Sequence, residues 1–375
     1  MEDTIVEGKA RILRKKEGLE AFYNPLGYFS RSVFVKIFTA YARIRGGELT
    51  YAEPFSGTGI KAIRLALEGE GFIRFLLNDL SRSAAELARL NWTQNSPKGE
   101  VQIFNLDVHD FLETLSRLGR VDAMDVDPFG SSAPYVFNSV RAIKGEGLVA
   151  FTFTDTQVLG GIHSEALYKR YHVAARKVSF LKEMQARIAA ANVIMEASVL
   201  NLAAVPVFAH VDKHYIRTYH IIRPSAKLAL ELVSELNSLL ISSCGYVTRE
   251  ELYCCPYCYD RMLPVGPIYT GRIYDKRIIS VAKDLSEDCP ECKKLFEMAL
   301  EELDEIPYYY DLRALSSNLK TQTPATRDLV DLLKEMGYRA SRTAFYTSGV
   351  KTEAPFGVLR SLFYQRPGKQ QFFRK

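Results

Sequence analysis

The chain has 375 residues, which is too long for one small domain and suits two domains at about 150 residues each. With 47% hydrophobic and 25% charged residues, it has the composition of an ordinary globular protein. Its net charge of +5, from 49 basic and 44 acidic residues, permits nucleic-acid binding without requiring it. The first 18 residues lack the apolar core of a secretory signal, and the apolar stretch 188–211 is interrupted by polar residues. We therefore expect a cytoplasmic protein with no membrane partner.

The amino-terminal segment is basic and polar over its first 18 residues. We expect it to be flexible, either as a solvated tail or as an arm that contacts phosphates. Phe22 and Tyr23 follow, ahead of Arg31 and an apolar helix expected over 33–41. The two aromatic residues have two possible roles, as a lid over a site or as ordinary core residues.

A strand, a glycine turn, a helix and a second strand follow one another over residues 49–80. Residues 49–52 predict the first strand, Gly57-Thr58-Gly59 the turn, 60–67 the helix and 72–77 the second strand, which ends near Asp79. In such a unit the glycines let the backbone approach a ligand, and an acid at the next strand tip accepts hydrogen bonds from a ribose. The pattern predicts a nucleoside site. It also fits the fingerprint of nicotinamide-dependent oxidoreductases, which stays as an alternative.

The same edge of the predicted sheet receives a third acid. A helix capped by Ser81 is followed by a strand over 101–106, and Asp107 comes directly after it. Asp107 has two possible roles: contact with the base of the nucleoside, or capping of the next helix. Further strands are expected at 121–126, 147–153, 205–211 and 215–222, with residues 164–204 mostly helical; seven strands with intervening helices make a three-layer α/β domain.

The fourth strand ends in Asp127-Pro128-Phe129-Gly130. The exocyclic amine of a purine is a poor nucleophile, and a carboxylate and a carbonyl that accept its hydrogens would favour its pyramidal form while a ring fixes the base. Asp127, the Pro128 carbonyl and Phe129 suit these roles in methyl transfer from S-adenosylmethionine. The alternatives are that Asp127 is a helix N-cap, or that Asp125 and Asp127 bind Mg²⁺.

The residue composition changes after residue 224. An amphipathic helix is expected over 227–240, and six cysteines follow it. Cys255-Pro-Tyr-Cys258 and Cys289-Pro-Glu-Cys292 form two CPxC pairs, which predict a structural zinc site of the zinc-ribbon kind. The alternative is disulfides, as in some intracellular proteins of hyperthermophiles. Cys244 and Cys254 are expected to be spare, although Cys254 can replace Cys255 as a ligand. A helix over 325–336 precedes a basic and aromatic end suited to RNA, including Arg366, Phe372, Phe373 and Arg374.

Several of these motifs together resemble the tRNA guanine-N2 dimethyltransferases. The resemblance covers nearly the whole chain, and its ordered combination is more specific than any single motif. It rests on Phe22-Tyr23-Asn24-Pro25 with Arg31, residues 57–64, Asn78-Asp79, Asp127-Pro128-Phe129-Gly130 and residues 351–355. Relatives commonly have tyrosine where this chain has Phe129, so stacking is kept and a phenolic hydrogen bond is lost.

The resemblance implies a class I methyltransferase with a Rossmann-like seven-stranded sheet, helices on both faces, and a smaller α+β carboxy-terminal domain with a zinc-ribbon-like element. It implies that residues 1–223 form the S-adenosylmethionine-dependent domain and residues 224–375 the tRNA-binding domain. The expected activity is dimethylation of N2 of guanosine 26 in tRNA, with no obligate protein partner; a non-catalytic RNA-binding zinc protein is a further alternative. The expected catalytic residues are Asp127, Pro128, Phe129 and Phe22. The expected cofactor-binding residues are Arg31, Glu53, Gly57, Thr58, Gly59, Arg64, Asp79, Asp107 and Val108. The expected zinc ligands are Cys255, Cys258, Cys289 and Cys292.

Overall fold

The computed structural model describes residues 3–16, 18–212 and 214–364. The chain divides into two compact units, one of residues 1–156, 189–235 and 273–300 and the other of residues 157–188, 236–272 and 301–375. The sequence predicted two consecutive domains that meet after residue 223, whereas the compact units interleave. They interleave because a late helix, α10 (Lys276–Asp284), packs against the early helix α1 (Tyr28–Arg45). The assignment of residues 1–223 to the cofactor and 224–375 to tRNA stays a prediction.

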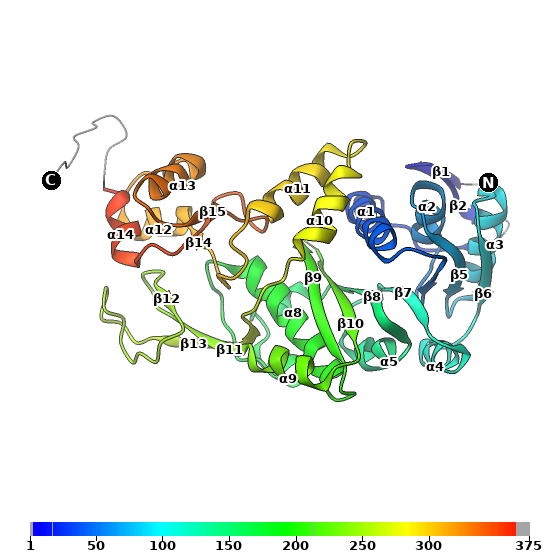
Figure 1. Cartoon of the computed structure of the whole chain (residues 1–375), viewed down its shortest axis with the longest axis horizontal. Coiled ribbons are helices and arrows are strands. Elements are labelled where there is room, and N and C mark those ends of the chain that lie inside the picture. Colours follow the sequence, from blue (N-terminus) through cyan, green and yellow to red (C-terminus); the bar gives the residue numbers. More distant parts are fainter. Residues whose placement is uncertain (1–2, 17, 213, 365–375) are drawn as a thin grey trace. The chain divides into compact units, whose positions relative to one another are not determined.

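The first unit contains a seven-stranded sheet in the order β6-β5-β4-β7-β8-β10-β9, which confirms the predicted α/β class (Figure 1). The first five strands in this order are parallel, and β10 runs antiparallel to both β8 and β9. The carboxyl ends of the parallel strands share one edge, so the loops after them converge there. The strands are β4 (Leu49–Glu53), β5 (Phe72–Asn78), β6 (Glu100–Phe104), β7 (Val121–Val126), β8 (Ile143–Phe153), β9 (Ala203–Val211) and β10 (Ile216–Arg223).

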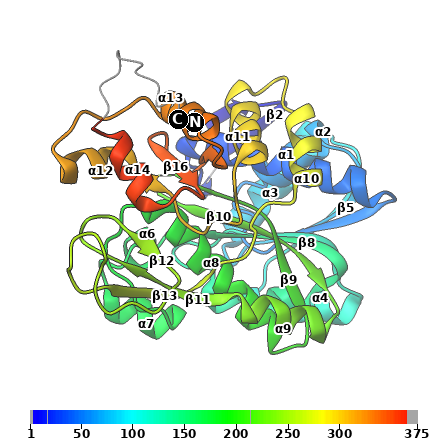
Figure 2. The ribbon, with the colours of Figure 1, turned by 60° about the vertical axis from the view of Figure 1, so that its left-hand side comes forward.

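Helices cover both faces of this sheet, with α1, α2 and α10 on one side and α4, α5 and α9 on the other (Figures 1 and 2). Ser81 caps α3 as the sequence predicts, since its hydroxyl accepts a hydrogen bond from the Ala84 amide. Asp275, for which the sequence analysis made no prediction, caps α10 by accepting from the Arg277 and Ile278 amides. The remaining helices of this unit are α2 (Ile60–Glu68), α3 (Arg82–Asn95), α4 (Val108–Leu118), α5 (Val136–Arg141) and α9 (Ala226–Ser234), with 3-10 turns at Pro25–Gly27 and Ala133–Tyr135. Three helices run from one unit into the other: α6 (Thr156–Leu159), α8 (Leu181–Ser198) and α11 (Pro290–Glu301).

The amino-terminal segment is a β-hairpin rather than the predicted flexible tail. β1 (Asp3–Glu7) and β2 (Ala10–Lys16) pair antiparallel around Gly8, and β3 (Leu19–Glu20) extends the sheet. Ala10, Ile12 and Leu13 of β2 are buried, whereas its charged residues Arg11, Arg14 and Lys15 are exposed. The fully buried Asn91 accepts from the Leu13 amide at 2.7 Å and donates to the Leu13 carbonyl at 2.9 Å, which fastens the hairpin to α3.

The second unit contains two three-stranded sheets, β12-β11-β13 and β14-β16-β15. Buried residues of α12, α13, α14 and the second sheet form its apolar core, with Leu312, Leu333, Val350 and Leu359 fully enclosed. Its elements are α7 (Ser164–Tyr171), β11 (Leu236–Ile241), β12 (Val247–Thr248), β13 (Leu263–Tyr269), β14 (Tyr310–Asp311), α12 (Leu312–Leu319), α13 (Thr326–Glu335), β15 (Ala340–Arg342), β16 (Gly349–Thr352) and α14 (Phe356–Leu362).

Lys351, from a motif on which the resemblance rests, has a structural position in this unit. Its ammonium group is fully buried and lies 2.6 Å from Glu183 Oε1 and 2.8 Å from Glu302 Oε1. It also donates to the Ile306 carbonyl at 2.8 Å. This network joins β16 to the beginning of α8.

Residues 164–204 are mostly helical, as predicted, and form α7 and α8 with an irregular stretch between them. The predicted helix 227–240 is wrong in extent, because it ends at Ser234. The run after Ser234 is β11, whose leucines pair with β13; short apolar runs fit a strand as well as a helix, and the pairing decides. Within the described part of the chain, no helix is both long and apolar enough to span a bilayer. Arg366, Phe372, Phe373 and Arg374 lie outside the described residues.

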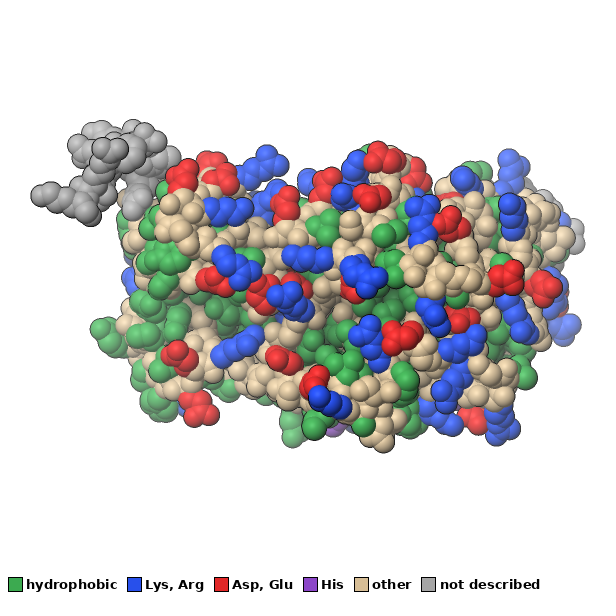
Figure 3. Space-filling view, in the orientation of Figure 1, with side chains coloured by type: hydrophobic (Ala, Val, Ile, Leu, Met, Phe, Trp, Pro, Cys, Tyr) green, Lys and Arg blue, Asp and Glu red, His purple; other side chains and the backbone are tan. Residues whose placement is uncertain are grey.

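Basic and acidic side chains are interspersed on the face shown in Figure 3. This distribution agrees with the modest net charge of +5.

Candidate active site

The turn after β4 is built on two glycines in the left-handed region, with φ of 50° at Gly57 and 77° at Gly59. A Cβ at Gly59 would lie 3.3 Å from the Cβ of Ala88, so both backbone and packing favour glycine there. The amide of Gly57 donates a hydrogen bond to Asp79 Oδ2 at 2.9 Å. The predicted turn and the predicted acid at the tip of β5 are therefore in direct contact.

Asp79 keeps capacity to bind a ligand. Its Oδ1 accepts a hydrogen bond from the Ser81 amide at 2.9 Å, so each oxygen accepts one backbone N–H. A carboxylate oxygen can accept two hydrogen bonds, and the half-buried Asp79 can still accept from a ribose.

Asp107 caps α4, which is one of its two predicted roles: its Oδ1 accepts from the His109 amide at 2.8 Å. Val108 is the first residue of α4 and is nearly buried. Asn78 joins two loops of this edge, since its amide group donates to the Pro54 carbonyl at 3.2 Å and to the Leu106 carbonyl at 3.1 Å. Contact of Asp107 and Val108 with a cofactor stays a prediction.

Lys61 links the glycine turn to the tip of β7. It comes from the first turn of α2, and its buried ammonium group lies 2.9 Å from Asp127 Oδ2 and 3.2 Å from Glu53 Oε1. It also donates to Asp125, whose other oxygen accepts from Arg217. Because β4 and β7 are neighbours in the sheet, this ammonium group reaches carboxylates from both strands.

The charges around Asp127 keep it ionised. Burial alone would raise the pKa of Asp127, but the positive charges of Lys61 and Arg217 and the hydrogen bond from Lys61 outweigh it and hold the pKa below its ordinary value. The Asp127 side chain is 33% exposed, whereas that of Asp125 is fully buried. Lys61 and Arg217 occupy the positions around Asp125 and Asp127 that a Mg²⁺ ion would need. This arrangement argues against the Mg²⁺ alternative.

Glu53 has the opposite character. Its side chain is fully buried, and the Lys61 ammonium group lies 3.2 Å from its Oε1. Burial raises the pKa of Glu53 to about 8, although Lys61 counteracts it. Contact of this buried carboxyl with a cationic cofactor stays a prediction.

Two aromatic rings stand exposed beside Asp127. Phe129 is 81% exposed and Phe22 is 63% exposed, and their ring centroids lie 4.9 Å apart in an edge-to-face arrangement. Backbone and side-chain hydrogen bonds between Gly130 and Thr154 hold the loop that carries Phe129. Pro128 is buried and sets the direction of this loop. The structure thus brings the four predicted catalytic residues to one place.

Arg31 and Arg64 have a protein carboxylate as partner. Arg31 Nε lies 2.7 Å from Glu7 Oε1, and an Arg64 terminal nitrogen lies 2.9 Å from the same oxygen. Tyr23 donates to the other oxygen of Glu7 at 2.7 Å. The pKa of Glu7 is lowered, because the hydrogen bonds and charge of Arg31, with the hydrogen bonds of Tyr23 and Arg64, outweigh the effect of burial. The sequence predicted cofactor contacts for both arginines and missed Glu7, which it placed in a tail.

The cysteines are grouped differently from the prediction. Cys289 and Cys292 form a disulfide, so their sulfurs are not thiolate ligands in this structure. Cys255 and Cys258 instead gather with Cys244, and the three sulfurs lie within 4.8 Å of one another. The Tyr257 amide donates to Cys255 Sγ at 3.4 Å. A metal site on Cys255 and Cys258 stays a prediction, and Cys244, which the sequence analysis expected to be spare, lies within reach of the same centre.

Sequence reasoning gave no role to Lys61, Arg217 or Glu7. All three side chains are buried, and a buried charge needs a partner. The sequence shows that these residues are charged, but it does not show which residues they pair with.

Comparisons with known proteins agree with this geometry. The family model described as N2,N2-dimethylguanosine tRNA methyltransferase matches residues 2–364. A tRNA (guanine(26)-N(2))-dimethyltransferase of Methanothermobacter thermautotrophicus is 31% identical over 356 residues, covering 91% of this chain and 92% of the relative. The protein of the same description from Methanocaldococcus jannaschii is 30% identical and covers 92% and 93%.

A solved structure has the same fold over almost the whole length. It is the complex of Trm1 from Pyrococcus horikoshii with S-adenosyl-L-methionine, with a TM-score of 0.84, 27% identity and coverage of 96% of this chain and 99% of that one. The glycine turn, the acid at the tip of β5, the DPFG loop and the match over residues 2–364 lead to one conclusion: the chain belongs to the N2,N2-dimethylguanosine tRNA methyltransferase family.

Proposed function

We propose that this protein transfers methyl groups from S-adenosylmethionine to the exocyclic N2 of guanosine 26 in tRNA and forms N2,N2-dimethylguanosine. The observation that carries the proposal is the position of Asp127. This ionised carboxylate stands at the carboxyl end of β7, beside the strand that leads into the glycine turn, and Lys61 connects the two. The oxidoreductase alternative rested on the glycine pattern alone, and the family match replaces it.

When bound, S-adenosylmethionine supplies an electrophilic methyl group on a sulfonium. Gly57 and Gly59 would let the turn backbone approach the cofactor closely, and Asp79, each of whose oxygens accepts one backbone N–H, would accept further hydrogen bonds from the ribose hydroxyls. Glu53, paired with Lys61, would add a buried carboxyl at the end of β4.

Asp127 acts on the target amine. As N2 forms its bond to carbon it gains positive charge and must lose a proton, and a carboxylate that accepts the N–H both steers the lone pair and receives that charge favourably. The low pKa of Asp127 keeps it in the accepting form at neutral pH. Two methyl transfers consume both hydrogens of N2, so the amine must turn or rebind between them.

The exposed rings of Phe22 and Phe129 are suited to hold the guanine. A base inside folded tRNA has to leave its stack before an enzyme can reach it, and aromatic side chains offer it a new stacking surface. Their exposure in the free protein is costly unless a partner covers them, which supports this role.

We also propose that Cys244, Cys255 and Cys258 hold a structural zinc ion. Three sulfurs of a soft donor type within reach of one centre fit Zn²⁺, which favours thiolate ligands. Such an ion would fix the loop between β11 and β13 and take no part in the chemistry.

The test of the methyltransferase proposal uses methyl-labelled S-adenosylmethionine and transcribed tRNA, followed by digestion to nucleosides. The wild-type protein is expected to yield labelled N2,N2-dimethylguanosine, and a transcript with adenosine at position 26 should stay unlabelled. Asp127→Ala should remove transfer while calorimetry still detects binding of S-adenosylhomocysteine. Unchanged turnover in this variant would refute the role of Asp127.

A further inference from the structure

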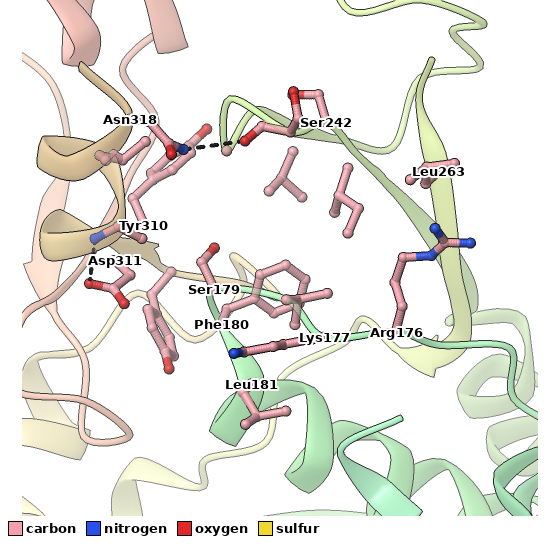
Figure 4. Close-up of a pocket in the computed structure, with 18 of the residues that line it drawn as sticks. Arg176, Lys177, Ser179, Phe180, Leu181, Ser242, Leu263, Tyr310, Asp311 and Asn318 are labelled. Atoms are coloured by element: carbon pink, nitrogen blue, oxygen red, sulfur yellow. Dashed lines mark hydrogen bonds between the residues drawn. The ribbon is translucent and has the colours of Figure 1, made fainter. Parts of the chain in front are cut away.

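The second unit contains a cavity that the active-site residues do not line. Its volume is about 970 Å³, at the upper end of the ~300–1,000 Å³ typical of small-molecule sites. Its walls come from the three segments 176–182, 241–263 and 309–346. Figure 4 shows labelled side chains from these segments around a common space, with Arg176 and Leu263 across from Tyr310 and Asn318. Six of the lining residues are exposed, so the cavity opens to solvent.

The floor of this cavity is apolar and aromatic. Phe180, Tyr309 and Leu315 are buried, and the half-buried Tyr346 stacks on Tyr309 with ring centroids 5.8 Å apart and planes inclined by 22°. Asn318 lies at one side of the cavity, where its side-chain amide donates to the Ser243 carbonyl at 3.2 Å and leaves its carbonyl oxygen as a possible acceptor (Figure 4). Flat rings with a few polar groups at the edge suit a flat, heteroaromatic ligand.

The rim is cationic. Arg176, Lys177 and Lys182 line the cavity from the segment before α8, and Arg261 lines it from the loop before β13. In the described part of the chain, the first three form no ion pair. Two acidic residues also line the cavity: Asp311, which caps α12 through the Arg313 and Ala314 amides, and Asp260, which accepts from the Ser243 hydroxyl. Four basic and two acidic side chains give the lining a net charge of +2.

We propose that this cavity binds one unpaired nucleotide of the tRNA substrate, separate from the guanosine that is methylated. The base stacks over the floor rings, and Arg176, Lys177 and Lys182 contact the phosphates on either side of it. The partner class rests on the proposed tRNA methyltransferase function. Neither a buried peptide nor a simple anion would use both the aromatic floor and the spread of cations around it.

The first test removes the cations. In the Arg176→Ala/Lys177→Ala double variant, both changed residues are exposed, so folding should be preserved. Its Kd for tRNA should rise about tenfold, and the slope of log K against log salt should become shallower by about 0.7 for each lost phosphate contact. The matched control is Arg327→Ala/Lys334→Ala, which removes two exposed cations of α13 that do not line the cavity. An equal effect in both variants would overturn the proposal.

The second test fills the space and leaves the cations in place. Ala314 lines the cavity from α12 and is half-buried, so Ala314→Trp should narrow the cavity. This variant should lose affinity for a short fluorescent single-stranded oligoadenylate, measured by anisotropy, and should raise the KM for tRNA with kcat unchanged. Thermal unfolding checks that it is folded. Wild-type affinity in the folded variant would show that the cavity takes no nucleotide.

These readouts separate this proposal from the function on which it rests. If the wild-type protein binds oligoadenylate and forms no dimethylguanosine, the cavity is supported and the methyltransferase proposal fails. If dimethylguanosine forms while both cavity variants keep wild-type KM and Kd, only the cavity proposal fails.

Discussion

The Lys61 ammonium group lies 2.9 Å from Asp127 Oδ2, although the two residues are 66 positions apart in the chain. This contact joins the helix that follows the glycine turn to the strand tip that carries the proposed chemistry. Its removal is expected to affect both stability and turnover.

Replacement of Lys61 by Met should destabilise the protein by about 3–5 kcal/mol, because it leaves buried carboxylates without their cation. Turnover should fall by about 10²-fold or more, since Asp127 loses the group that fixes it. Chemical unfolding and the labelled-methyl assay measure the two effects. Lys144→Met is the matched control, because it breaks a more exposed ion pair with Asp122 and should cost less than about 1 kcal/mol. Equal losses in the two variants would contradict the assigned importance of Lys61.

The same contact predicts the pH dependence of methyl transfer. Because the pKa of Asp127 is lowered, protonation of this residue should reduce kcat/KM only at a pH below its ordinary value of 3.8. In Lys61→Met burial remains while the nearest positive charge is gone, so the acidic limb should move to higher pH. A pH profile of kcat/KM for tRNA in both proteins checks this. An acidic limb at the same pH would show that Lys61 does not control the ionisation of Asp127.

Glu53 should make the protein less stable as the pH rises. Its folded pKa of about 8 lies above the ordinary value of 4.5, so its contribution to stability is fully present below pH 4.5 and is lost as the pH rises through 8. The free energy of unfolding should fall by about 1.4 kcal/mol for each pH unit in this window. Glu53→Gln should remove that dependence. Urea unfolding of both proteins at several pH values measures it, and parallel curves would mean that Glu53 is ionised in the folded state.

Phe129→Ala should reduce kcat/KM for tRNA about 5- to 150-fold, the range expected when ~1–3 kcal/mol of base stacking is lost. Its melting temperature should stay close to that of the wild type, because the ring is 81% exposed. Leu26→Ala, which removes a side chain that is 77% exposed, is the control and should leave both quantities unchanged. A large loss of stability in Phe129→Ala would identify the ring as a packing residue.

Glu7→Ala should cost about 3–5 kcal/mol, because it leaves the buried guanidinium groups of Arg31 and Arg64 without their shared carboxylate. Asp3→Ala in the same strand breaks an exposed pair with Arg14 and should cost less than about 1 kcal/mol. Differential scanning calorimetry distinguishes the two. A small loss in Glu7→Ala would mean that the arginines find other partners.

Local signals in the sequence predicted much of this fold. The glycine turn, the acid at the tip of β5 and the DPFG loop follow from strand periodicity and turn chemistry over a few residues, and the parallel topology then places them on one edge. The roles of Lys61 and Arg217 were out of reach. They depend on the pairing of β4 with β7 and of β8 with β10, which local patterns do not specify.

The amino-terminal hairpin and the position of Cys244 were missed because both depend on contacts between residues distant in the chain. The hairpin strand β2 buries Ala10, Ile12 and Leu13 among exposed basic residues, and its high net charge resembles that of a solvated tail. Cys244 lies eleven positions before Cys255, outside the CPxC spacing, and joins the thiol cluster only through the loop that follows β11.

The three hydrogen bonds of the Asn91 side chain mean that few other residues can replace it. It accepts from the Leu13 amide while its nitrogen donates to the carbonyls of both Leu13 and Thr58, at 2.9 Å each. Aspartate at this position would lack the donors, and leucine would lack donors and acceptor alike. An expression variant trimmed to begin after residue 16 would remove two of the three hydrogen bonds of this amide and uncover the apolar face of α3 on which Leu13 packs, so the hairpin has to be retained whenever the protein is shortened for crystallisation.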